Sequence, residues 1–174
     1  MNIKNPSKPQ YNERAWAIDL ISAINRSVSE EDIIQRAGGE YSLPEDRNTT
    51  LFPDVLLFGN LLNGSVLQGW ELKFPDTAIN DSELLQNAEE KANRLGLDSF
   101  LVWNVAIADL YVRDKTNQRF VFYERLYENR VITTRDDVEK SQDIWIDALK
   151  KIIKQIKSFL SKVIILGTDE KKIF

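Results

Sequence analysis

The sequence contains neither cysteine nor histidine. Without cysteine the chain cannot form disulfides or bind zinc through thiolates. Without histidine it lacks the usual general base of enzymes and the most frequent ligand of transition metals. Any catalysis must therefore rely on carboxylates, lysines, hydroxyl groups or a hard cation that is bound through oxygen.

Long apolar runs and an excess of positive charge are also absent. No apolar run approaches the ~20 residues that a membrane-spanning helix needs. The polar start MNIKNPSKPQYNER lacks the apolar region of a signal peptide, so we expect a cytoplasmic protein. The formal net charge of −4 gives no overall attraction to nucleic acid, although local patches and bound cations can reverse this at a site.

The remaining composition is that of an ordinary folded protein. Of the 174 residues, 43% are hydrophobic and 29% are charged, which is typical of a globular domain. This length is sufficient for a substantial core but not for several domains. We therefore expect residues 1–174 to form a single domain.

The N-terminal third predicts two helices. Asn12 can cap a helix that begins at Glu13, in which apolar residues recur at helical spacing. The segment SVSEEDIIQRAGGE, residues 27–40, predicts a second, short helix that Gly38 and Gly39 would end.

The middle of the chain predicts a hairpin followed by a helix. The segments PDVLLFGN (53–60) and SVLQGWELKF (65–74) are typical of strands, and Asn63-Gly64 between them is a strong turn signal. Asn80 or Asp81 then caps a helix that Gly96 closes.

The C-terminal part predicts further strands and a long helix. Residues 99–114 supply one or two strands with a break near Asn104, and residues 119–126 supply another. Residues 135–163 predict a long amphipathic helix, placed to lead into a following domain. Its apolar face consists of Trp145, Leu149, Ile152, Ile156, Phe159 and Val163. This element order predicts an α/β fold with a central sheet, and we expect the four tryptophans to be core residues.

The hairpin carries charged residues in otherwise apolar strands. Glu71 and Lys73 are two positions apart, so their side chains point to the same face of the strand. Asp54 on the first strand pairs near them, although the turn leaves this register open by a residue or two. The opposite face of the second strand is apolar, with Trp70, Leu72 and Phe74.

Two carboxylates and a lysine on one patch of a sheet have a chemical use. Carboxylates bind Mg²⁺ through oxygen, and the metal polarises a phosphoryl oxygen and activates a water. Lys73 can orient that water or stabilise charge on the phosphate. Without a metal, Asp54 and Glu71 would repel each other. The alternative is a solvent-exposed face with an ordinary cross-strand ion pair.

The pattern Pro53-Asp54, then a hairpin and Glu71-Leu72-Lys73, resembles the PD-(D/E)xK motif of the restriction-endonuclease-like nucleases. The resemblance covers residues 13 to about 113. It implies a central mixed β-sheet flanked by helices in αβββαβ order. It also implies a Mg²⁺-dependent endonuclease, in which Mn²⁺ can replace Mg²⁺, with Asp54 and Glu71 as metal ligands and Lys73 as a catalytic residue.

Two further residues match positions in that family. Glu13 matches an acid that the helix before the motif often supplies, here as a further metal ligand, and Gln86 matches a glutamine in the helix after it. Some subfamilies have a tyrosine four positions after this glutamine, where this chain has Glu90. Glu13 is equally explained as a first-turn acid favoured by the helix dipole, and Gln86 as a solvated helix residue. Glu40 can reach the site but is more simply an exposed loop acid.

Residues 67–104 also resemble the nuclease segment of fused restriction-modification polypeptides, in which an adenine methyltransferase and a target-recognition region follow. The chain has no sequence-reading module of its own. The expected partners are therefore double-stranded DNA, a methyltransferase or target-recognition domain or subunit, and a second copy that dimerises transiently on DNA. The rivals are a repair or junction-resolving nuclease of the same fold and a non-catalytic interaction domain. The last helix carries the densest basic cluster of the chain, which is most simply the solvated face of the helix. The alternatives are that it contacts DNA phosphates or a following domain. The cluster consists of Lys150, Lys151, Lys154, Lys157 and Lys162.

Overall fold

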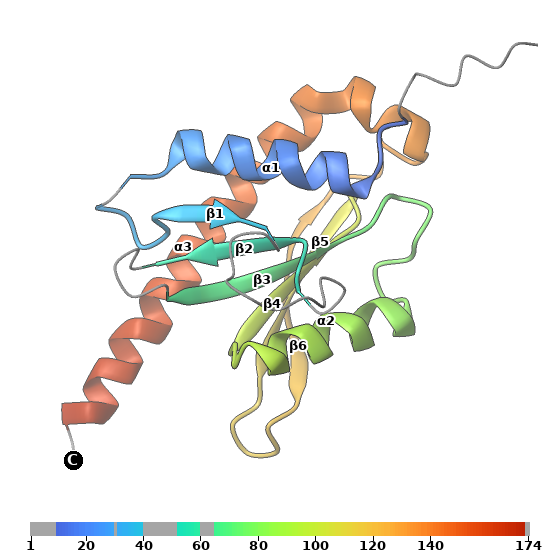
Figure 1. Ribbon diagram of the computed structural model, residues 1–174. Coiled ribbons are helices and arrows are strands. Elements are labelled where there is room, and N and C mark those ends of the chain that lie inside the picture. The colour runs from blue at the N-terminus through green and yellow to red at the C-terminus, as the bar shows by residue number, and fades with distance from the viewer. Residues whose placement is uncertain (1–9, 30, 40–51, 60–64, 173–174) are drawn as a thin grey trace, which may run out of the picture.

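The computed structural model describes residues 10–29, 31–39, 52–59 and 65–172, with side chains as far as residue 163. The predicted turn at Asn63-Gly64 and the loop acid Glu40 lie outside the described residues. Within them, six strands form one sheet in the order β1-β2-β3-β4-β5-β6 (Figure 1). The strands β3 and β4 are parallel and every other neighbouring pair is antiparallel, so the sheet is mixed. The predicted α/β class with a mixed sheet and flanking helices is confirmed.

The helices and strands follow each other in an αβββαβββα order. Their bounds are α1 Glu13–Ser27, β1 Arg36–Gly38, β2 Val55–Phe58, β3 Val66–Leu72, α2 Ser82–Arg94, β4 Ser99–Trp103, β5 Ile107–Arg113, β6 Phe120–Glu128 and α3 Gln142–Lys172.

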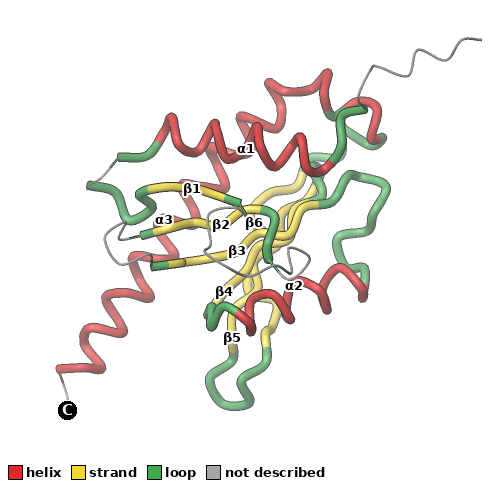
Figure 2. The backbone as a smooth tube through the Cα atoms, in the orientation of Figure 1, coloured by secondary structure: helices red, strands yellow, loops and turns green. Residues whose placement is uncertain are grey.

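The sheet is covered on both faces. Helices α1 and α3 pack on one face, around a large core cluster, and α2 packs on the other face over a smaller one (Figures 1 and 2). The larger core contains all four tryptophans, as predicted, and each is at most 1% exposed. Trp16 of α1 is at the centre of this group, with its ring 4.8 Å from that of Trp103. Buried aromatic area of this kind is a large contribution to stability.

The predicted helix caps are present. Asn12 Oδ1 accepts a hydrogen bond of 2.9 Å from the Ala15 N–H at the start of α1. Asp81, rather than Asn80, caps α2, because its Oδ2 accepts the Leu84 N–H at 3.0 Å. Gly96 ends α2 with a φ of +65°, a conformation that favours glycine.

The prediction of a second helix over residues 27–40 is wrong. The described part of this segment is a loop followed by β1, which pairs with β2. The Asn25 side chain bonds both the N–H and the carbonyl of Ala37, at 2.8 and 3.0 Å, and so holds β1 against α1. These contacts come from outside the segment and override its local helical signals.

The last helix begins at Gln142, seven residues later than predicted. Residues 135–137 and 139–141 are short 3₁₀ turns instead. The Trp145 indole N–H donates to the Val138 carbonyl at 2.9 Å, which ties the turns to the helix. The predicted apolar face is buried from Trp145 to Ile156. Beyond Ile156, the buried residue that continues this face is Leu160, whereas the predicted Val163 is 40% exposed. No helix within the described residues is long and apolar enough to cross a membrane.

Candidate active site

Asp54 lies directly before β2 and is fixed by the neighbouring strand. Its N–H donates to the Trp70 carbonyl at 2.9 Å, and its Oδ2 accepts the Leu72 N–H at 2.8 Å. Val55 pairs with Trp70, so Asp54 lies opposite Glu71. The structure thus determines the strand register that the sequence left open, and in this register the two carboxyl groups lie across from each other.

A close contact between the two strands supports this register. Pro53 packs on Gly69, where an added Cβ would lie only 2.6 Å from the Pro53 Cγ. Glycine is therefore required at this point of β3, because no side chain fits between the strand and the proline ring. Proline is tolerated directly before β2, since Pro53 precedes the first residue of the strand.

Glu71 is buried beneath α2. Only 7% of the residue is exposed, and its Oε1 accepts a hydrogen bond of 2.6 Å from Lys91 Nζ. Its other oxygen, Oε2, is buried and has no hydrogen-bond partner among the described residues. A buried carboxylate oxygen without a donor is unfavourable, so this oxygen is available to a cation.

The charges around the pair act on both carboxyl groups. Burial raises the pKa of Asp54. Burial, together with the charge of Asp54, raises the pKa of Glu71 to about 7. The positive charges of Lys91 and Lys73 oppose both shifts. The predicted triad thus shares one electrostatic environment. The Lys73 residue is half-buried, and its backbone N–H donates to the Trp103 carbonyl at 3.0 Å.

Lys91 is a member of this site that the sequence analysis missed. It lies on α2, and its side chain is 14% exposed. A signal was present: Lys91 follows the buried Leu84 by seven positions and Ala88 by three, so it lies on the apolar stripe of the helix. A lysine on a buried stripe indicates a buried acidic partner, because an unpaired ammonium is unfavourable there.

Glu13 and Gln86 differ in their relation to the pair. The charge of Glu13 raises the pKa of Asp54, so Glu13 lies near the site, but its carboxylate also lies 3.5 Å from Arg135. Gln86 is exposed, with its amide 3.4 Å from the Glu90 carboxylate. It precedes Lys91 by five positions, which places it about 140° away around the helix. The structure does not bring Gln86 into contact with the carboxylates.

The donor set fits one hard divalent cation. Asp54 and Glu71 lie opposite each other on adjacent strands, the charge of Asp54 acts on Glu71, and the Glu71 Oε2 is buried with no donor among the described residues. Oxygen ligands and a small number of carboxylates are what Mg²⁺ prefers, with water completing its coordination. The described part of the chain has no group of three or more acidic residues placed to hold a metal together. Glu13 as a further metal ligand therefore stays a prediction.

The raised pKa of Glu71 predicts an unusual pH dependence of stability. An acid whose pKa is higher in the folded state stabilises the protein below its ordinary pKa, and this contribution is lost as the pH rises. From the ordinary 4.5 to about 7, the loss is on the order of 3 kcal/mol. Without divalent metal, the unfolding free energy should fall between pH 5 and pH 8. Denaturant titrations of Glu71→Gln should lack most of this fall, and an equal fall in both proteins would contradict the assignment.

Comparison of the chain with protein-family models, with curated proteins and with solved structures gave no significant match. What the site does must therefore be inferred from its own chemistry.

Proposed function

We propose that this chain is a Mg²⁺-dependent endonuclease domain that hydrolyses phosphodiester bonds of DNA, with a restriction-endonuclease-like fold. The observation that carries the proposal is the pairing of Asp54 and Glu71 across two adjacent strands, with the Glu71 Oε2 buried and without a donor among the described residues. The order αβββαβ from α1 to β4 agrees with the one that the PD-(D/E)xK resemblance implies.

Each residue of the site has a role in this reaction. Asp54 and Glu71 hold the metal, and the Leu72 N–H fixes the orientation of the Asp54 carboxylate. When bound, Mg²⁺ supplies a Lewis acid that neutralises negative charge on the scissile phosphate. The ammonium of Lys73 orients the attacking water and donates to the phosphate oxygens as charge develops there. The water oxygen bonds to phosphorus, the bond to the leaving nucleotide breaks, one water proton is released, and the leaving oxygen takes up a proton.

Lys91 keeps the site intact when no metal is bound. Its bond of 2.6 Å to Glu71 provides a positive charge beside the buried carboxylate. Because this charge opposes the raised pKa of Glu71, it favours the ionised form that a metal requires. Lys91 therefore acts on the metal ligand, as a positioning residue.

Target choice and double-strand cleavage need partners in this proposal. We expect a methyltransferase or target-recognition domain or subunit to select the sequence. Two copies of the chain would act on opposite strands. The net charge of −4 disfavours a self-sufficient repair or junction-resolving nuclease, because such an enzyme would need its own basic DNA surface.

Metal binding tests the proposal directly. Calorimetric titration with Mn²⁺ should show saturable binding to the wild type and a loss of at least about tenfold in affinity for Asp54→Ala, because one of two charged ligands is removed. Asp98→Ala is the matched control, since this carboxylate is 79% exposed and lies outside the pair; it should bind as the wild type does. Equal binding by Asp54→Ala and the wild type would favour a non-catalytic interaction domain.

A further inference from the structure

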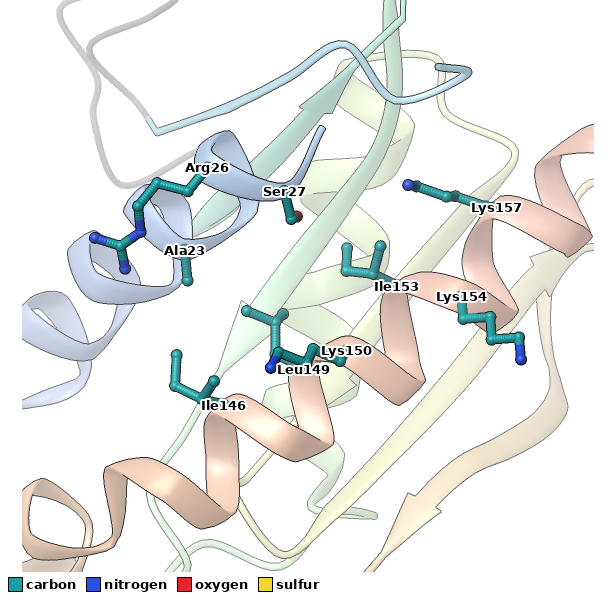
Figure 3. Close-up of a pocket in the computed structure, with 9 residues that line it drawn as sticks. All are labelled: Ala23, Arg26, Ser27, Ile146, Leu149, Lys150, Ile153, Lys154 and Lys157. Carbon is teal, nitrogen blue, oxygen red and sulfur yellow. The ribbon is translucent and has the colours of Figure 1, made fainter. Parts of the chain in front are cut away.

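A groove of about 520 Å³ lies between α1 and α3 (Figure 3), the two helices on the face of the sheet opposite α2 (Figure 1). Apolar side chains of both helices line it, and basic side chains from both helices surround them. The apolar lining consists of Ala23, Ile146, Leu149 and Ile153, and the basic residues are Arg26, Lys150, Lys154 and Lys157.

Most of this positive charge has no acidic partner in the described structure. Lys157 donates to Asp32 at 2.7 Å. Within the described residues, Arg26, Lys150 and Lys154 have no ion pair or hydrogen bond through their side chains. A concentration of unpaired positive charge on a chain of net charge −4 is a local departure from the average. Such a surface attracts an acidic ligand and disfavours pairing with the same groove of a second copy of this chain, where like charges would face each other.

The arrangement of the charges indicates the shape of that ligand. Lys150, Lys154 and Lys157 follow one another at spacings of four and three residues along α3. They are spread over about 10 Å of helix, and Arg26 lines the groove from α1. An acyl chain carries its charge at one end, so it would not match a row of cations. DNA would match the cations but not the apolar lining.

We propose that this groove binds an acidic amphipathic helix of a protein partner. The apolar side chains of that helix would lie on the partly exposed Ala23 and Ile146, above the buried Leu149 and Ile153, and its flanking carboxylates would meet the cations. This is the helix-in-groove mode of recognition. The groove contacts α1 at its C-terminal end, whereas Glu13 is at the other end, about 15 Å away along the helix. The docked helix would therefore leave the candidate active site open, and the inference does not depend on the nuclease proposal.

The test uses a designed helical peptide of about 14 residues, roughly 20 Å long, with leucines at helical spacing and glutamates on both flanks. Fluorescence anisotropy of the labelled peptide should show saturable binding to the wild-type chain, weakened by added salt. The double variant Lys150→Glu/Lys154→Glu should bind it at least about tenfold more weakly, because attraction becomes repulsion on one side of the groove. The control Lys140→Glu/Lys162→Glu has the same change in charge outside the groove and should bind as the wild type does.

Three results would overturn the proposal. The first is the absence of saturable binding of the acidic peptide to the wild type. The second is equal loss of binding in the two double variants, which would indicate net charge alone. The third is a preference for another ligand, seen as displacement of the peptide by dodecanoate or by a short DNA duplex. Melting curves of both variants, matching that of the wild type, will show that the substituted chains remain folded.

Discussion

The substitution Lys73→Ala should reduce Mg²⁺-dependent cleavage of plasmid DNA by about 10²–10³-fold, because it removes a positively charged donor from the developing phosphate charge. The melting temperature should change little. The Lys73 side chain is half-buried and has no hydrogen bond or ion pair within the described residues. Its strand contact, to the Trp103 carbonyl, is made by the backbone N–H and survives the substitution.

Two controls make this result specific. Lys162→Ala removes an exposed lysine from the far part of α3 and should cut DNA as the wild type does. Asp54→Asn, purified in the same way, should be inactive, which excludes a contaminating nuclease. A Lys73→Ala protein that cuts at the wild-type rate would remove Lys73 from the mechanism, while loss of activity together with unfolding would point to a structural role.

The substitution Lys91→Met should destabilise the protein at pH 8. It leaves the Glu71 carboxylate without its partner at 2.6 Å, so the pKa of Glu71 should rise further above about 7. Because Glu71 can then take up a proton instead of staying charged, the cost at pH 8 is limited to about 1.4 kcal/mol, one pH unit above that pKa. For a chain of this size the melting temperature should fall by about 4 °C. Methionine fills similar space, so the effect isolates the lost charge.

The pH and a second substitution distinguish this cause from poor packing. At pH 5 Glu71 is protonated, because its pKa is raised to about 7, so the cost of Lys91→Met should nearly disappear. At pH 8 the double variant Glu71→Gln/Lys91→Met should recover much of the stability lost in Lys91→Met. A loss that is the same at both pH values, with no recovery in the double variant, would show that Lys91 contributes through packing alone.

Much of the fold could be predicted because its signals are local. Asn12 and Asp81 cap the helices through bonds to residues three positions away, and Gly96 ends α2 through its own φ. The pairing of apolar and charged faces on β3 follows from strand alternation alone. The position of each of these features depends on few residues, and those residues are neighbours in the chain.

The features that were mispredicted or missed depend on distant contacts. The strand β1 exists because its backbone pairs with β2 and with the Asn25 amide, and no pattern inside residues 31–39 indicates those partners. The 3₁₀ turns that replace the predicted start of α3 include Arg135, which donates to Asp76, 59 positions away, at 3.0 Å. The site itself shows both cases. Alternation predicted that Glu71 and Lys73 share a face, whereas the place of Lys91 beside Glu71 required the docking of α2 on the sheet.

The grouping of the four tryptophans has a consequence for spectroscopy. All of them belong to the core between the sheet and the helices α1 and α3, and neither α2 nor the smaller core beneath it contains one. Intrinsic emission should therefore follow the loss of one half of the molecule. A partial opening that lifts α2 and separates Lys91 from Glu71 would change circular dichroism or amide exchange while leaving emission nearly constant.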